Sequence, residues 1–179
     1  MNILVTTMGV SWQIIPELLG FTNPHFVDLF ANHPSCLDQA CVVLAKKAIE
    51  HNVKYIEVRC SPVKYAGQGM TEQEVCKIIT KSFSEYHDRL KISLIFTASR
   101  HGEIDQIKQH VALAGIIAGQ ENEKALISLK DFDLAGDEKI CSASKMQSYF
   151  LPIMKKCMPF SIHAGEDNPS DSIWEAVYY

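Results

Sequence analysis

Residues 91–118 read KISLIFTASRHGEIDQIKQHVALAGIIA, and this stretch predicts one strand followed by one helix. Its first part, residues 91–98, is apolar and rich in β-branched side chains, as expected for a strand. From residue 104 onward, apolar side chains recur every three or four positions, which is typical of a helix that buries one face. The stretch therefore predicts a strand–helix unit of an α/β fold.

The same alternation recurs before and after this stretch. Further strands are predicted at 53–60, 125–134 and 158–163, and further helices at 37–48, from a Thr71–Glu74 capping box to about residue 90, at 142–156 and from Pro169 onward. Successive strand–helix units favour a parallel sheet with helices packed outside it. A complete (β/α)8 TIM barrel takes about 250 residues, so we expect about half of one.

Composition excludes several classes of protein. The sequence has 17 basic and 21 acidic residues and a net charge of -4, so it lacks the positive charge that binding to long nucleic acid requires. The apolar run at residues 2–5 is too short for a signal peptide, and no run approaches the roughly 20 apolar residues of a membrane span. Six cysteines without a CxxC pair favour reduced thiols over a disulfide framework. We expect a cytoplasmic protein that binds no membrane.

The stretch SIHAGED, residues 161–167, places polar groups where a predicted strand ends. His163 closes the strand, and Glu166 follows three residues later. Barrel enzymes carry their chemistry at this end of the strands. Imidazole is a good zinc ligand, and an unligated glutamate can transfer protons. On these residues alone, a metal-dependent site and an ordinary loop remain equally open.

Two further stretches place charged groups at strand ends. YIEVRCSP occupies residues 55–62, and DFDLAGDE occupies residues 131–138. Charged residues are not expected at the end of a strand that has only a structural role. If the three strand ends face the same side of one parallel sheet, their side chains form a polar pocket.

The ordered set YIEVRCSP, DLAGDE and SIHAGED resembles the motifs of the adenosine deaminase family, and the resemblance covers residues 36–179. It implies an incomplete TIM barrel of the adenosine deaminase and amidohydrolase type. It also implies a hydrolase that removes the exocyclic amine of adenine by hydrolysis and uses a bound Zn2+ ion. In this reading residues 36–179 form the deaminase domain.

The resemblance also implies roles for individual residues. His163 is a zinc ligand, and Glu166 is the catalytic residue that gives a proton to the purine ring. Gly136 binds the substrate purine through its backbone N–H group, and Asp133 lies near the substrate. For Arg59, an ion pair that braces the barrel is favoured over a direct role.

The sequence departs from the family pattern in its histidines. The family has a His-x-His pair in its first barrel strand, and this chain contains none. Outside SIHAGED and the Arg100–His101 strand end, we expect the histidines to face solvent or make local hydrogen bonds: His25, His33, His51, His87 and His110. One of the family's protein ligands is therefore present, so these residues alone should bind zinc weakly. We expect a part of a longer protein, or a truncated relative.

The N-terminal stretch differs from the rest. Residues 2–7 predict a strand, residues 12–19 predict a helix, and the breakers in residues 21–35 predict a linker or a junction. On the residues alone, a plain strand–turn–helix is favoured over a ligand site. The run from Leu4 to Pro24 nevertheless resembles the start of a CARF domain, the Rossmann-like sensor of cyclic oligoadenylates in type III CRISPR systems.

This second resemblance implies a CARF-like fragment at residues 1–30, ahead of the deaminase domain. The residues implied to bind cyclic oligoadenylate are Thr6, Thr7, Gly9, Ser11 and Trp12. The implied function is an antiviral effector that converts ATP to ITP when cyclic oligoadenylate binds. Sensors of this type pair, so a homo-oligomer is expected.

Two other functions remain open on the sequence. A purine-salvage adenosine deaminase needs no sensor, and its activity on adenosine would ignore cyclic oligoadenylate. A catalytically inactive barrel acting as a binding module is suggested by the absent metal ligands. Metal content separates this last hypothesis from the two enzymes.

Overall fold

The computed structural model describes residues 3–8, 33–67, 69–101, 103–120, 126–166 and 170–178. Its strands are β1 (Ile3–Met8), β2 (Tyr55–Cys60), β3 (Lys91–Ser99), β4 (Ser128–Ala135) and β5 (Phe160–Ile162). Its helices are α3 (Pro34–Glu50), α4 (Pro62–Tyr65), α5 (Glu72–Ser84), α6 (Ile104–Gln120), α7 (Ala143–Met154) and α8 (Asp171–Tyr178). The chain divides into two compact units, 1–94 with 121–128 and 95–120 with 129–179.

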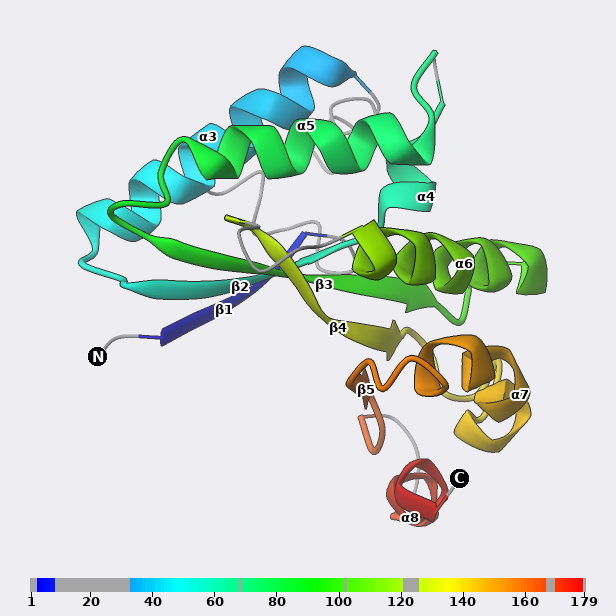
Figure 1. Cartoon of the computed structure of the whole chain (residues 1–179). Coiled ribbons are helices and arrows are strands. Elements are labelled where there is room, and N and C mark those ends of the chain that lie inside the picture. The colour runs from blue at the N-terminus through cyan, green and yellow to red at the C-terminus, as the bar shows by residue number, and fades with distance from the viewer. Residues whose placement is uncertain are drawn as a thin grey trace. The chain divides into compact units, whose positions relative to one another are not determined.

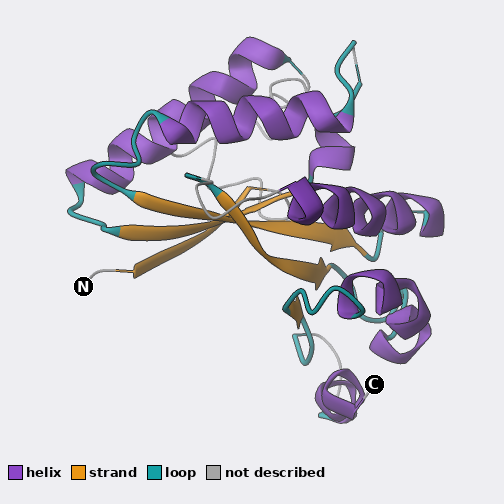
Figure 2. Cartoon of the chain, viewed as in Figure 1, coloured by secondary structure: helices purple, strands orange, loops and turns teal. Residues whose placement is uncertain are grey.

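The described strands are hydrogen-bonded in the order β1-β2-β3-β4-β5, which is also their order in the sequence (Figure 1). The pairs β1–β2 and β4–β5 are parallel. Helices follow each of the strands β2, β3, β4 and β5 (Figure 2). The predicted α/β architecture of strand–helix units around a parallel sheet is therefore confirmed.

In the first unit, β1 pairs with β2 from Ile3 opposite Tyr55 to Met8 opposite Cys60. The strand predicted at residues 2–7 is thus present, and it lies in the same sheet as the strands of the predicted barrel. Of the segment 1–30, the structure describes residues 3–8, and these pair with β2. The helix predicted at 12–19 and most of the predicted linker lie outside the described residues.

Helices α3 and α5 pack side by side on one face of the sheet of the first unit (Figure 1). Their facing sides are apolar, because buried residues recur at helical spacing in both: Leu37, Cys41, Leu44 and Ala48 in α3, and Val75, Cys76, Ile79 and Phe83 in α5. β2 contributes Ile56, Val58 and Cys60 to the same core by strict alternation. The short helix α4, which begins at Pro62, was not predicted.

All six cysteines are free thiols. Cys41, Cys60 and Cys76 are buried, and burial raises the pKa of Cys76 to about 12. A thiol with so high a pKa is uncharged at neutral pH, and the thiolate is the nucleophilic form. These three cysteines therefore serve as small apolar core residues.

The capping box predicted at the start of α5 is present. The Thr71 hydroxyl accepts a hydrogen bond from the Glu74 N–H group at 3.3 Å, and Thr71 N–H donates to Glu74 Oε2 at 2.8 Å. The helix ends at Ser84 instead of near residue 90. Beyond Ser84, backbone N–H groups donate to carbonyls three residues earlier instead of four, as Arg89 N–H does to the Tyr86 carbonyl.

Replacing Thr71 with alanine removes the capping acceptor and is expected to lower the free energy of unfolding by about 1 kcal/mol. Urea unfolding followed by circular dichroism measures the change. The matched control is Thr80→Ala in the same helix, where the hydroxyl donates to the Cys76 and Lys77 carbonyls and caps no N–H group in the described part of the chain. Because alanine is the better helix former, the control should be neutral or stabilising, and an equal loss in both variants would contradict the capping role.

In the second unit, β5 pairs with β4 from Phe132 opposite Phe160 to Leu134 opposite Ile162. β5 is shorter than the predicted strand 158–163, but the ladder continues one step, because His163 N–H donates to the Leu134 carbonyl at 2.9 Å. Phe150 of α7 contacts Phe132 edge to face and stacks on Phe160, at centroid distances of 5.6 Å and 6.1 Å. This aromatic cluster fixes β4 and β5 beneath the loops that follow them.

None of the helices in the described ranges has the length and apolar character needed to cross a membrane.

Candidate active site at the ends of β4 and β5

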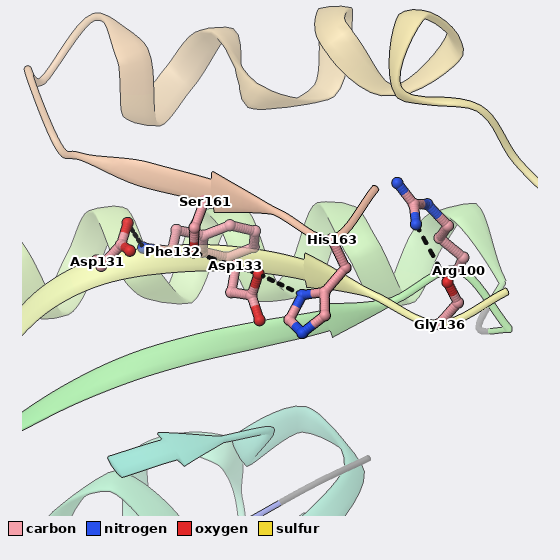
Figure 3. A network of polar contacts seen from close by, with 7 residues as sticks. All are labelled: Arg100, Asp131, Phe132, Asp133, Gly136, Ser161 and His163. Carbon is pink, nitrogen blue, oxygen red and sulfur yellow. Dashed lines mark hydrogen bonds and ion pairs between the residues drawn. The ribbon is translucent and has the colours of Figure 1, made fainter. Parts of the chain in front are cut away.

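The centre of the candidate site is a pair between Asp133 of β4 and His163, which follows β5 (Figure 3). Asp133 is fully buried, whereas 31% of the His163 side chain is exposed. The His163 Nδ1 atom lies 3.0 Å from Asp133 Oδ1. An ionised carboxylate only accepts hydrogen bonds, so this contact favours the neutral tautomer with its proton on Nδ1 and its lone pair on Nε2. The imidazole is therefore held with a basic nitrogen on its far side.

Asp133 belongs to the last four residues of β4, Phe132–Ala135, and all four are buried. A buried carboxylate is costly unless donors compensate its charge. Besides His163, the Ser161 hydroxyl donates to the same Oδ1 atom at 3.3 Å, from the residue opposite Asp133 in the sheet register. An oriented histidine against a buried carboxylate is a typical arrangement for a metal ligand or a proton-transfer group.

The loop after β4 begins at Gly136, whose φ of +103° lies in the region that favours glycine. Arg100, at the end of β3, donates from Nη1 to the Gly136 carbonyl at 3.1 Å. The next N–H group, of Asp137, donates to His101 Nε2 at 3.2 Å. The strand end Arg100–His101 therefore contacts the DLAGDE motif directly.

Glu138 lies in the loop after β4 and connects this loop to the loop after β5. The Glu138 side chain is buried, and its Oε1 atom accepts a hydrogen bond from Glu166 N–H at 2.9 Å. The Gly165 N–H group and the Ser172 hydroxyl also donate to this carboxylate. One carboxylate thus fixes two consecutive N–H groups, and with them the point from which the Glu166 side chain extends.

The pKa of Glu138 lies below its ordinary value. Burial opposes ionisation, but the hydrogen bonds from Gly165, Ser172 and Glu166, together with the charge of Arg100, outweigh it. A carboxyl group with a lowered folded-state pKa stabilises the fold above its unfolded pKa of about 4.3. This contribution is lost as the pH falls through the lower folded-state value.

We therefore expect Glu138→Gln to destabilise the chain at neutral pH, and the difference from the parent to shrink as the pH falls below about 5. Urea unfolding at a series of pH values from neutral to acidic measures the difference. The exposed residue Glu85 provides the matched control, Glu85→Gln. A difference between parent and Glu138→Gln that stays constant with pH would contradict the assigned hydrogen bonds.

Arg100 places a positive charge among the acidic groups of this site. It is only 2% exposed, and desolvation lowers its pKa, while the charges of Glu138, Asp133 and Glu166 act in the opposite direction. The Glu166 carboxylate, although exposed, therefore lies within electrostatic reach of Arg100. A buried cation beside several carboxylates favours their ionised forms.

The structure thus brings together two of the predicted site residues, His163 and Asp133, in direct contact. Gly136 and Glu166 lie in the two adjoining loops, which Glu138 connects. Of the residues predicted to bind cyclic oligoadenylate, Thr6 and Thr7 lie on β1 in the other unit, and Gly9, Ser11 and Trp12 lie outside the described residues.

The described residues include no group of three or more His, Cys, Asp or Glu side chains that could hold a metal ion. His163 fits one ligand position, because ligating histidines usually donate their second ring N–H group to a carboxylate. Among the described residues, His163 therefore fits one zinc-ligand position, and they form no complete zinc centre.

The other histidines behave as expected. Local hydrogen bonds join His33 Nδ1 to Ser35 at 2.9 Å, His87 Nδ1 to the Ser84 carbonyl at 2.8 Å and His110 Nδ1 to the Gln106 carbonyl at 3.0 Å. His51 is exposed at the end of α3, and His25 lies outside the described residues.

Comparison with known proteins decides the family. The sequence model of the family "Adenosine deaminase" matches residues 20–179. The chain belongs to the adenosine deaminase family. This match confirms the family predicted from the three motifs, and it begins inside the segment 1–30 that was assigned to a CARF fragment. That assignment stays a prediction.

An adenosine deaminase from Clostridium perfringens is 27% identical over 147 residues, which cover 80% of this chain and 42% of the relative. An Arabidopsis protein complexed with IMP has a TM-score of 0.68 at 12% identity, covering 92% of this chain and 52% of that one. An amidohydrolase from Burkholderia ambifaria with bound Zn has a TM-score of 0.70 at 16% identity, covering 86% and 42%. This deaminase-family chain therefore shares the fold of TIM-barrel amidohydrolases and spans about half, or less, of each of these proteins.

Proposed function

We propose that the protein hydrolyses the exocyclic amine of an adenine nucleoside or nucleotide, releasing ammonia and leaving the inosine form. The observation that carries this proposal is the Asp133–His163 pair at the strand ends of a chain from the adenosine deaminase family. Glu166 begins in the adjoining loop, held by Glu138. This arrangement supports a site with one oriented ligand nitrogen and one carboxyl group able to transfer a proton.

We assign a separate role to each residue. His163 supplies Nε2 as one ligand of Zn2+, which when bound lowers the pKa of water toward neutrality. Asp133 orients the imidazole, Glu166 gives a proton to the purine ring, and Gly136 N–H binds the purine. Protonation of the ring by Glu166 relieves the negative charge that would otherwise build up as the amine-bearing carbon is attacked.

The test uses the protein that carries this chain at its full length, supplied with zinc and with adenosine or ATP in parallel. We expect ammonia together with inosine from the preferred substrate. Adenosine is supported by the Clostridium perfringens relative, and a nucleotide by the Arabidopsis protein that holds IMP. Zinc-loaded protein that folds but releases no ammonia from either substrate would reject the proposal, and folded protein with less than about one zinc per chain would favour a binding module.

A second candidate is a cyclic-oligoadenylate-activated form that converts ATP to ITP in type III CRISPR defence. Its support is the resemblance of Leu4–Pro24 to a CARF start, of which the structure describes the strand β1. In this form Thr6, Thr7, Gly9, Ser11 and Trp12 bind the activator in a homo-oligomer. Turnover of ATP that rises when cyclic oligoadenylate is added would favour it, and turnover indifferent to the activator would favour a purine-salvage enzyme.

A further inference from the structure

Two consecutive residues hold both polar groups of one peptide unit in the loop after β4. The unit joins Gly136 to Asp137. Arg100 donates from Nη1 to its carbonyl oxygen at 3.1 Å, and His101 Nε2 accepts from its N–H group at 3.2 Å. The C=O and N–H groups of a trans peptide point in opposite directions. Arg100 and His101 therefore hold the peptide plane from its two sides.

The preceding peptide unit, from Ala135 to Gly136, is fixed as well. The Arg100 N–H group donates to the Ala135 carbonyl at 2.8 Å. By the same trans geometry, the N–H group of Gly136 points away from the Arg100 backbone. The direction of this N–H group is thus set by contacts with the end of β3.

Gly136 is matched to these contacts by its lack of a side chain. A Cβ atom on Gly136 would lie 2.9 Å from His101 Cδ2 and 3.3 Å from the Arg100 backbone nitrogen. The φ of +103° disfavours any other residue in addition. The strand end and the loop therefore approach more closely than a side chain would allow.

Arg100 is placed at a cost to the fold. Its side chain is 2% exposed, and its Nε atom has no hydrogen-bond partner among the described residues. A buried donor without an acceptor is destabilising. The guanidinium instead uses its Nη1 atom to hold the loop, through the Gly136 carbonyl.

We propose that Arg100 and His101 are positioning residues, which fix the two peptide units around Gly136 so that the Gly136 N–H group is aimed for purine binding. The aiming of the N–H group at a purine rests on the proposed function. The holding of the peptide unit by the two residues does not, because it follows from the contacts alone.

The test uses His101, because Arg100 is buried among carboxylates and its removal could unfold the chain. His101→Leu removes the acceptor of the Asp137 N–H group, and we expect this amide to exchange with solvent about tenfold faster. His101→Gln keeps an acceptor oxygen and should restore most of the protection. The exposed residue His87 provides the matched control, His87→Leu. Amide hydrogen exchange followed by 15N NMR gives the rates.

The second readout is the dissociation constant for purine riboside, which we expect to rise about fivefold in His101→Leu and little in His101→Gln. Unchanged exchange of the Asp137 amide in His101→Leu would overturn the clamp, whether or not the protein binds purines. Faster exchange with an unchanged dissociation constant would overturn the positioning role. Failure of every variant and of the parent to bind purine would reject the proposed function, while the exchange rates still decide the clamp.

Discussion

Glu166→Gln is expected to lower kcat for adenine deamination by about 10^2- to 10^4-fold, because an amide can neither give nor take the proton that the purine ring needs. Substrate binding should be kept, since the substitution changes one atom of an exposed side chain. The hydrogen bond from residue 166 to Glu138 should persist, because it uses the backbone N–H group. Steady-state kinetics and a purine binding measurement on the full-length protein separate the two effects.

The matched control for this prediction is Glu103→Gln, an exposed glutamate just before α6 in the same unit. It removes the same charge without touching the loops after β4 and β5. The control should leave kcat near that of the parent. Equal activity of Glu166→Gln and the parent would remove Glu166 from the chemistry and leave its role to another acid.

Asp133→Asn is expected to weaken zinc binding by the full-length protein about 10- to 100-fold. The neutral amide is a weaker acceptor for the His163 Nδ1–H group, and its NH2 group can turn toward the ring instead. Either change lets the imidazole rotate and lowers the basicity of Nε2. Competition with a chelator of known affinity measures the zinc dissociation constant.

Ser161→Ala is the matched control for the buried carboxylate. It removes a second donor to Asp133 Oδ1, at 3.3 Å, and leaves the contact with His163 in place. We expect a much smaller change in zinc affinity than in Asp133→Asn. If the two substitutions weaken zinc equally, or if neither does, Asp133 does not act by orienting His163.

Much of the fold follows from local patterns in the sequence. The strand at 91–98 and the helix from 104 were predicted from periodicity, and the structure places β3 and α6 there. The Thr71–Glu74 box was predicted from two residue types and is formed. The end of α5 was not, because it depends on N–H groups that bond three residues back, and the length of β5 was not, because it depends on pairing with β4. Periodicity reports neither.

The candidate site was predictable residue by residue but not as a set of contacts. His163 and Asp133 could be found because each lies at the end of a predicted strand, but their pairing joins residues 30 positions apart. Glu138 was part of a quoted motif, yet its bond to Glu166 N–H, 28 positions away, depends on how two loops meet. The Arg100–His101 clamp had one signal, a charged strand end, and its target was visible only in three dimensions.

The proposed role of His163 depends on which ring nitrogen carries the proton, and 15N NMR of the histidine side chains measures this directly. We expect a neutral ring protonated at Nδ1, with a coupling or shift change at that nitrogen in Asp133→Asn. A ring protonated at Nε2 would contradict it, because the Asp133 contact would then not be a hydrogen bond and the nitrogen assigned to the metal would be blocked.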